Sequence, residues 1–140
     1  MPGELTQAGA NRAARAGVGQ TVTAASGMYV ALATALPGTP DTATLADYVT
    51  AGEVDTAGYA RQAVTWDAPA GDPSQVVNTL PLTFGAFEAD PPNVVYCWLC
   101  DTSTGPNGTV LAYWTLEAAR NGDSGDQLQF AAGDLRLAVD

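Results

Sequence analysis

The sequence predicts an all-β protein, an antiparallel β-sandwich or jelly-roll-like fold with one N-terminal helix. Three observations support this prediction. Short β-prone runs alternate apolar and polar residues, turn signals recur about every eight to twelve residues, and the 140 residues include 15 glycines and 9 prolines. With 46% hydrophobic and only 14% charged residues, the chain is expected to fold as one domain over residues 1–140.

The N-terminal segment is alanine-rich, and Leu5, Arg12 and Arg15 recur at helical spacing. This pattern predicts a helix over residues 3–18. Its apolar stripe is thin, so the helix needs a surface to lie against. Two roles stay open: the helix docks onto a partner subunit, or it covers an open end of the sandwich.

Residues 27–140 are expected to form the sandwich itself. A strand is predicted at Gly27–Thr34, one or two helical turns at Thr44–Gly52, and a second strand at Gly58–Trp66. The apolar run Val76–Phe87 contains a proline at position 81, which must lie at an edge or a bulge because proline cannot donate to a ladder.

The strongest strand prediction is Val94–Asp101, which is apolar almost throughout, as in a sheet buried on both faces. A turn and the run Thr109–Glu117 follow it, and this order predicts a hairpin. Two short strands then flank a tight turn at Ala132–Asp134. The residues expected to point inward from them are Leu128, Phe130, Leu135, Leu137 and Val139.

The run Gly122-Asp-Ser124-Gly125 has the four letters that surround the nucleophile of trypsin-like serine proteases. A serine nucleophile needs a base, and the chain contains neither histidine nor lysine. We therefore interpret the run as a turn. The sequence predicts no enzymatic activity and no cofactor.

Cys97 and Cys100 lie three residues apart on a predicted strand, so their side chains should point to opposite faces and form no disulfide. No other cysteine and no histidine exist to complete a zinc site. We therefore interpret the two cysteines as small apolar core residues.

Aspartates in several loops raise the question of a cation site. The segment Asp101–Asn107 resembles the start of a calcium loop, but Ala112 stands where the closing glutamate is needed. Aspartates 123, 126 and 134 could gather a cation at a loop end, although turn roles are the simpler interpretation. No metal site is predicted.

Three tryptophans, Trp66, Trp98 and Trp114, could form a platform for sugar. All three fall inside strand-like runs, which favours packing in the core or at a subunit interface. No pair of acidic residues marks a glycosidase.

The net charge of −10 comes from fifteen acidic residues against five arginines. This charge repels phosphate backbones, so direct nucleic-acid binding is not expected. No apolar run approaches the roughly 20 residues of a membrane span, and no secretory signal is predicted. The absence of lysine and isoleucine, which have A/T-rich codons, indicates a high-GC bacterium or its virus, for which we predict an actinobacterial host.

Four segments resemble, in this order, a family of small tailed-phage virion proteins described as tail-fibre-like or minor structural proteins. Its most specific pieces are Gly58-Tyr-Ala-Arg61 and the C-terminal Gly125-Asp126 run. The resemblance implies a non-enzymatic part of a bacteriophage particle. The segments are MYVALATALPGTPDTATL, AGYARQAVTW, NVVYCWLCDTSTGPNGTVLAYWTL and NGDSGDQLQFAAGDLRLAVD.

Three functions are compared for this chain. The favoured one is a capsid-surface accessory protein, a decoration or cement subunit bound to the major capsid protein or other virion proteins, and expected to be a homotrimer. The alternatives are a minor tail or tail-fibre component that contacts the host, and a carbohydrate-binding module. The candidate interface residues are Leu5, Arg12, Arg15 and Arg61, and Arg61 is expected to form a buried or interfacial ion pair.

Overall fold

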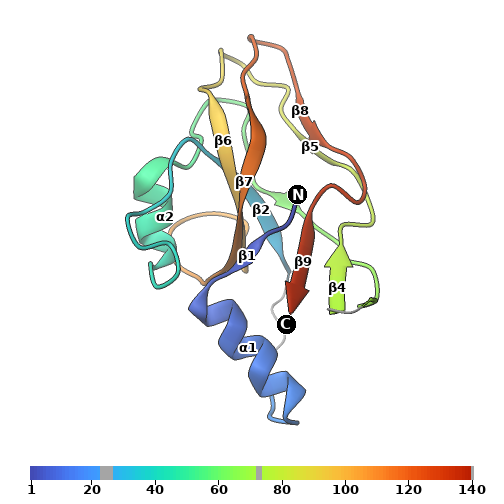
Figure 1. Ribbon diagram of the computed structural model, residues 1–140. Helices are drawn as coiled ribbons and strands as arrows, with labels where there is room; N and C mark the ends of the chain where they lie inside the picture. Colours follow the sequence, from blue (N-terminus) through green and yellow to red (C-terminus); the bar gives the residue numbers. More distant parts are fainter. Residues whose placement is uncertain (23–26, 72–73, 140) are drawn as a thin grey trace.

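The principal element of the fold is a five-stranded antiparallel sheet with the order β1-β7-β6-β2-β3. The computed structural model describes residues 1–22, 27–71 and 74–139 (Figure 1). The strands of this sheet are β1 (Glu4–Leu5), β2 (Tyr29–Ala33), β3 (Gln62–Ala63), β6 (Val94–Cys100) and β7 (Val110–Arg120). The hairpin expected from the sequence is the central pair of this sheet, β6 and β7.

Two short antiparallel ladders cover one face of the sheet. In one, β4 (Ser74–Val77) pairs with β9 (Arg136–Val139). In the other, β5 (Leu82–Phe84) pairs with β8 (Leu128–Phe130). Buried side chains from the ladders and from the sheet form one continuous apolar core. The predicted sandwich is therefore confirmed as the architecture of the protein.

The opposite face of the sheet is covered by helix α2 (Leu45–Gly52), which Figure 1 shows beside β6. Leu45 and Tyr48 of the helix pack on Ala31, Trp98 and Cys100 of the sheet in a second apolar cluster. Alternate residues of β2 and β6 thus enter different cores. This explains why both strands are apolar almost throughout.

The N-terminal helix is shorter than expected. Helix α1 spans Gln7–Gly17 rather than residues 3–18, because Glu4 and Leu5 instead pair with Tyr113 and Ala112 of β7. Thr6 ends this short strand and begins the helix, accepting a hydrogen bond from the N–H of Gly9 at 3.1 Å. In the described residues, neither helix has the length and apolar character needed to cross a membrane.

Two predicted strands are broken in the structure. Of Gly58–Trp66, only Gln62 and Ala63 join the sheet, while Trp66 makes an isolated bridge to Asn78. The run Val76–Phe87 is divided between β4 and β5, with the proline at position 81 lying between them. The two C-terminal strands, β8 and β9, flank their turn as predicted. They do not pair with each other, because β8 pairs with β5 and β9 pairs with β4.

Candidate interaction surface

Arg61 is the centre of a buried hydrogen-bond network. Its Nε and Nη2 donate to the two carboxylate oxygens of Glu53 at 2.7 and 2.8 Å, which is a bidentate ion pair. Nη1 and Nη2 also donate to the carbonyls of Thr102 and Gly105. The guanidinium lies over the Trp98 ring, 5.0 Å from its centroid. This network joins the end of α2 to the turn between β6 and β7.

Burial and hydrogen bonding shift the pKa of Arg61 in opposite directions. Burial alone would lower the pKa of its guanidinium, but the hydrogen bonds and charge of Glu53 outweigh burial, and the pKa is raised. Tyr59 completes the network by donating its hydroxyl to Glu53 at 3.1 Å. Burial first, and then the neighbouring carboxylate, raise the pKa of Tyr59, so its hydroxyl remains a donor.

The predicted ion pair of Arg61 is therefore confirmed as a buried one. The Arg61 side chain is only 3% exposed and that of Glu53 11%. A side chain so enclosed has little surface with which to contact a partner. The structure thus separates Arg61 from the other three candidate interface residues.

Leu5 and Arg12 line one groove beside α1. The groove has a volume of about 310 Å³ and a lining that is almost entirely apolar. Arg15, one turn further along α1, is exposed and donates through Nε to the neutral side chain of Gln20 at 3.3 Å. The roles of Leu5, Arg12 and Arg15 as interface residues stay a prediction.

The first half of α1 is joined to the body by hydrogen bonds and close packing. Thr6 donates its hydroxyl to the carbonyl of Val110 at 2.7 Å, and its N–H bonds to the carbonyl of Leu111. Gly9 is the buried residue of the helix, and a Cβ there would collide with that same Leu111 carbonyl. The second half of α1 extends away from the sandwich (Figure 1).

The aspartates considered as cation ligands have roles in turns. Asp126 accepts from the N–H of Asp123 at 2.9 Å, Asp134 from Ala131 at 2.8 Å, and Asp101 from Thr109 at 2.7 Å. In the described part of the chain, no group of three or more histidine, cysteine, aspartate or glutamate side chains could hold a metal ion.

The Gly-Asp-Ser-Gly run forms an exposed turn next to a neighbouring loop. The backbone N–H of Ser124 donates to the Asp90 carboxylate at 2.8 Å, and that of Gly125 donates to the carbonyl of Phe87. These contacts hold the loop around Asp90 against the loop around Ser124. The turn interpretation of this run agrees with its geometry.

The cysteines and tryptophans contribute to the interior. Cys97 lies in the core under the ladders and Cys100 in the core under α2, so the predicted opposite orientation is confirmed. Burial raises the pKa of the Cys97 thiol. Trp98 and Trp114 are buried, and Trp66 stacks on Trp114 with ring centroids 6.3 Å apart. The three rings therefore form no exposed row.

Comparison with known families identifies the chain. A family model described as podophage GP4 fiber I protein gp80 matches residues 6–138. The chain belongs to this family. No curated protein matches the chain. As a member of a phage fibre family, the chain is a bacteriophage virion structural protein, as the resemblance of its sequence segments implies.

Membership of the fibre family bears directly on the choice between head and tail. It agrees better with the tail-fibre alternative than with the favoured capsid-surface function. A fibre structural protein also agrees with the expectation that the chain is not an enzyme. The actinobacterial host, the partner protein and the trimer stay predictions.

Proposed function

We propose that this chain is a structural component of the tail fibre, the part of the particle that reaches the host surface. The observation that carries the proposal is the fibre-family match, which includes α1 and nearly all of the sandwich. The build of the molecule supports a structural role. Its polar clusters, the Arg61 network and the aspartate turns, tie segments of the fold together.

The location and copy number of the chain in purified particles test this proposal. Gold-labelled antibody raised against the purified chain should bind at the tail, and quantitative denaturing gels should show few copies relative to the major capsid protein. Antibody against the major capsid protein is the matched control for head labelling. Label spread over the head, with a near-stoichiometric band, would overturn the tail proposal in favour of a capsid-surface protein.

A further inference from the structure

The groove beside α1 is an apolar surface open to solvent at one end of the molecule. Its walls come from the helix on one side and from strands β1, β6, β7 and β9 on the other. Val18, at the end of the helix, is 74% exposed and extends the apolar character of this region. The lining residues that carry the argument are Gly9, Ala13 and Ala16 of α1 and Leu99, Leu111 and Leu137 of the sandwich.

Helix α1 is basic, although the protein is acidic. Helix α1 holds two of the five arginines and none of the fifteen acidic residues. Arg12 lines the groove, and Arg15 is exposed next to it with a neutral hydrogen-bond partner. A partner segment that fits here combines small apolar side chains with carboxylates.

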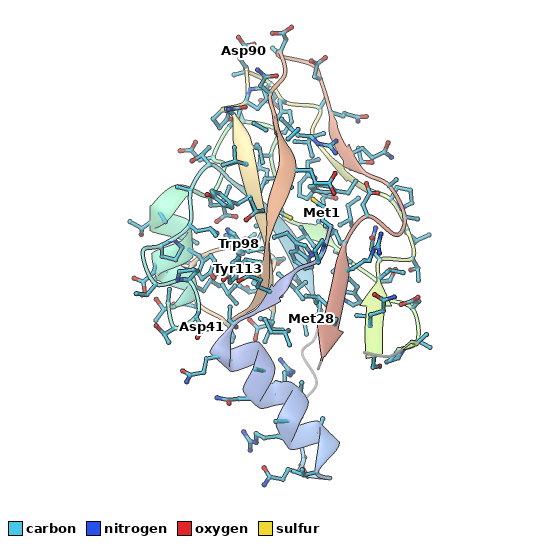
Figure 2. All side chains as sticks on the ribbon, in the orientation of Figure 1. Met1, Met28, Asp41, Asp90, Trp98 and Tyr113 are labelled. Atoms are coloured by element: carbon cyan, nitrogen blue, oxygen red, sulfur yellow. The ribbon has the colours of Figure 1, made fainter. Side chains whose placement is uncertain are left out.

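The loop between β5 and β6 has that chemistry and lies at the other end of the molecule. Figure 2 shows Asp90 of this loop at the end opposite α1. Residues 88–93 read Glu-Ala-Asp-Pro-Pro-Asn, and Glu88, Ala89, Asp90 and Pro92 are exposed. The hydrogen bond from Ser124 to Asp90 holds the loop beside the acidic turn at 123–126. The loop therefore presents apolar side chains flanked by negative charge.

We propose that the groove beside α1 receives the loop at residues 88–93 of a second copy of this chain. Ala89 and the two prolines occupy the apolar groove, while Glu88 faces Arg15. Groove and loop lie at opposite ends, so a pair of copies retains one unused groove and one unused loop. Such heterologous contacts join copies head to tail. The inference concerns the purified chain and is independent of where the protein lies in the particle.

Self-association of the purified full-length chain tests the proposal. At about 0.1 M salt, where the general repulsion between copies is screened beyond about 10 Å, sedimentation and light scattering should show a mass that rises with concentration without a plateau at a fixed size. At about 1 M salt, where screening shortens electrostatic interactions to about 3 Å, association should weaken strongly. A chain that is monomeric at every concentration at about 0.1 M salt would overturn the proposal.

Charge reversal identifies the two surfaces. Arg15→Glu and Glu88→Arg should each weaken self-association at least about tenfold, because each places like charges opposite one another. The double variant, which restores opposite charges, should recover it. Arg136→Glu and Glu117→Arg are the matched controls, since they make the same charge changes at exposed positions that line a different hollow. Equal loss in the controls, or no recovery in the double variant, would contradict the pairing.

Disulfide trapping gives a second readout that does not depend on charge. Ala13→Cys and Ala89→Cys chains, one of them carrying a size tag, are mixed and treated with a mild oxidant. The mixed dimer should predominate over either homodimer. The native Cys97 and Cys100 are buried and do not compete. Circular dichroism should first show that both variants have a native fold. A statistical distribution of mixed dimers and homodimers would then overturn the proposal. The outcome of these association experiments does not affect the particle-labelling test, which reports the location of the chain in the particle.

Discussion

Arg61 illustrates how one residue connects distant parts of this chain. Its guanidinium satisfies both oxygens of Glu53 and two carbonyls of the turn after β6, and it packs on Trp98. Removing one partner of a buried ion pair leaves the other charge unpaired in the interior, which costs more than the pair itself contributes. The carboxylate of Glu53 would then keep the Tyr59 hydroxyl as a side-chain donor.

We therefore expect Arg61→Ala to lower the free energy of unfolding by about 3–5 kcal/mol. Urea denaturation followed by circular dichroism measures the change. Arg136→Ala, at an exposed arginine, is the control and should change stability by less than about 0.5 kcal/mol. Equal stability of the Arg61 variant and the wild type would mean that the network does not stabilise the fold.

Two glycines of α1 should respond to alanine with opposite signs. Alanine favours an exposed helix over glycine by about 1 kcal/mol. Gly17 has open space around it, so Gly17→Ala should be neutral or stabilising. Gly9→Ala should be destabilising, because its new methyl group would meet the backbone carbonyl of Leu111. Thermal melting of the two variants checks this, and similar shifts for both would show that α1 does not pack on β7 as described.

At the scale of elements, local signals located α2 well and α1 less well. The sequence predicts α2 from Thr44 to Gly52, and the helix spans Leu45–Gly52 with Thr44 as its N-cap. Both hydrogen bonds of its capping box join Thr44 and Asp47, which are three residues apart, so this signal is local in the sequence. Residues 4 and 5 look helical by the same rules. Their pairing with Ala112 and Tyr113 is a contact over more than a hundred residues, and it overrides that local preference.

The capping box of α2 makes stability depend on pH. The backbone N–H and then the hydroxyl of Thr44 donate to Asp47 and lower its pKa below the ordinary value of 3.8. A lowered pKa in the folded state adds stability above pH 3.8 that is lost as the pH falls through the lower folded value.

We expect Thr44→Ala to cost about 1 kcal/mol of unfolding free energy at neutral pH, as is typical of a lost N-cap. The difference from the wild type should narrow in acid, because a protonated Asp47 loses its part of the box in both proteins. Urea titrations in steps from neutral pH down to about pH 2 measure it. Thr50→Ala, at an exposed position within α2, is the control. A cost that grows in acid would contradict the assigned role of Asp47.

At the scale of the whole molecule, net charge controls how copies approach one another. The charge of −10 at pH 7 and the isoelectric point near 4.1 mean that general repulsion between copies disappears in mild acid. We expect the lowest solubility near pH 4.1. Turbidity of a concentrated solution across a pH series measures it, with the neutral samples as the reference. A solubility minimum near neutral pH would show that formal charge does not govern solubility here.

The candidate surface shows the limit of prediction for this protein. The spacing of Leu5, Arg12 and Arg15 in the sequence predicted them as interface residues. In the structure Leu5 and Arg12 line the groove beside α1, and Arg15 lies in the last turn of the helix. The groove itself needs Leu99, Leu111 and Leu137, which lie on three different strands. No spacing rule joins these leucines, because only the packing of the two layers brings them together. The partner of Arg61 was missed for the same reason.

The sequence by itself determined the β class, the central hairpin, the opposite orientation of Cys97 and Cys100, and the capped helix α2. Each depends on residues close together in the chain, where period-two alternation and capping chemistry act directly. Tertiary structure alone decided that residues 4 and 5 form a strand, that β8 and β9 pair with different ladders, and that Glu53 is the partner of Arg61. These features need contacts between distant segments, whose free energy comes from the burial of shared apolar surface and becomes available only when the layers pack.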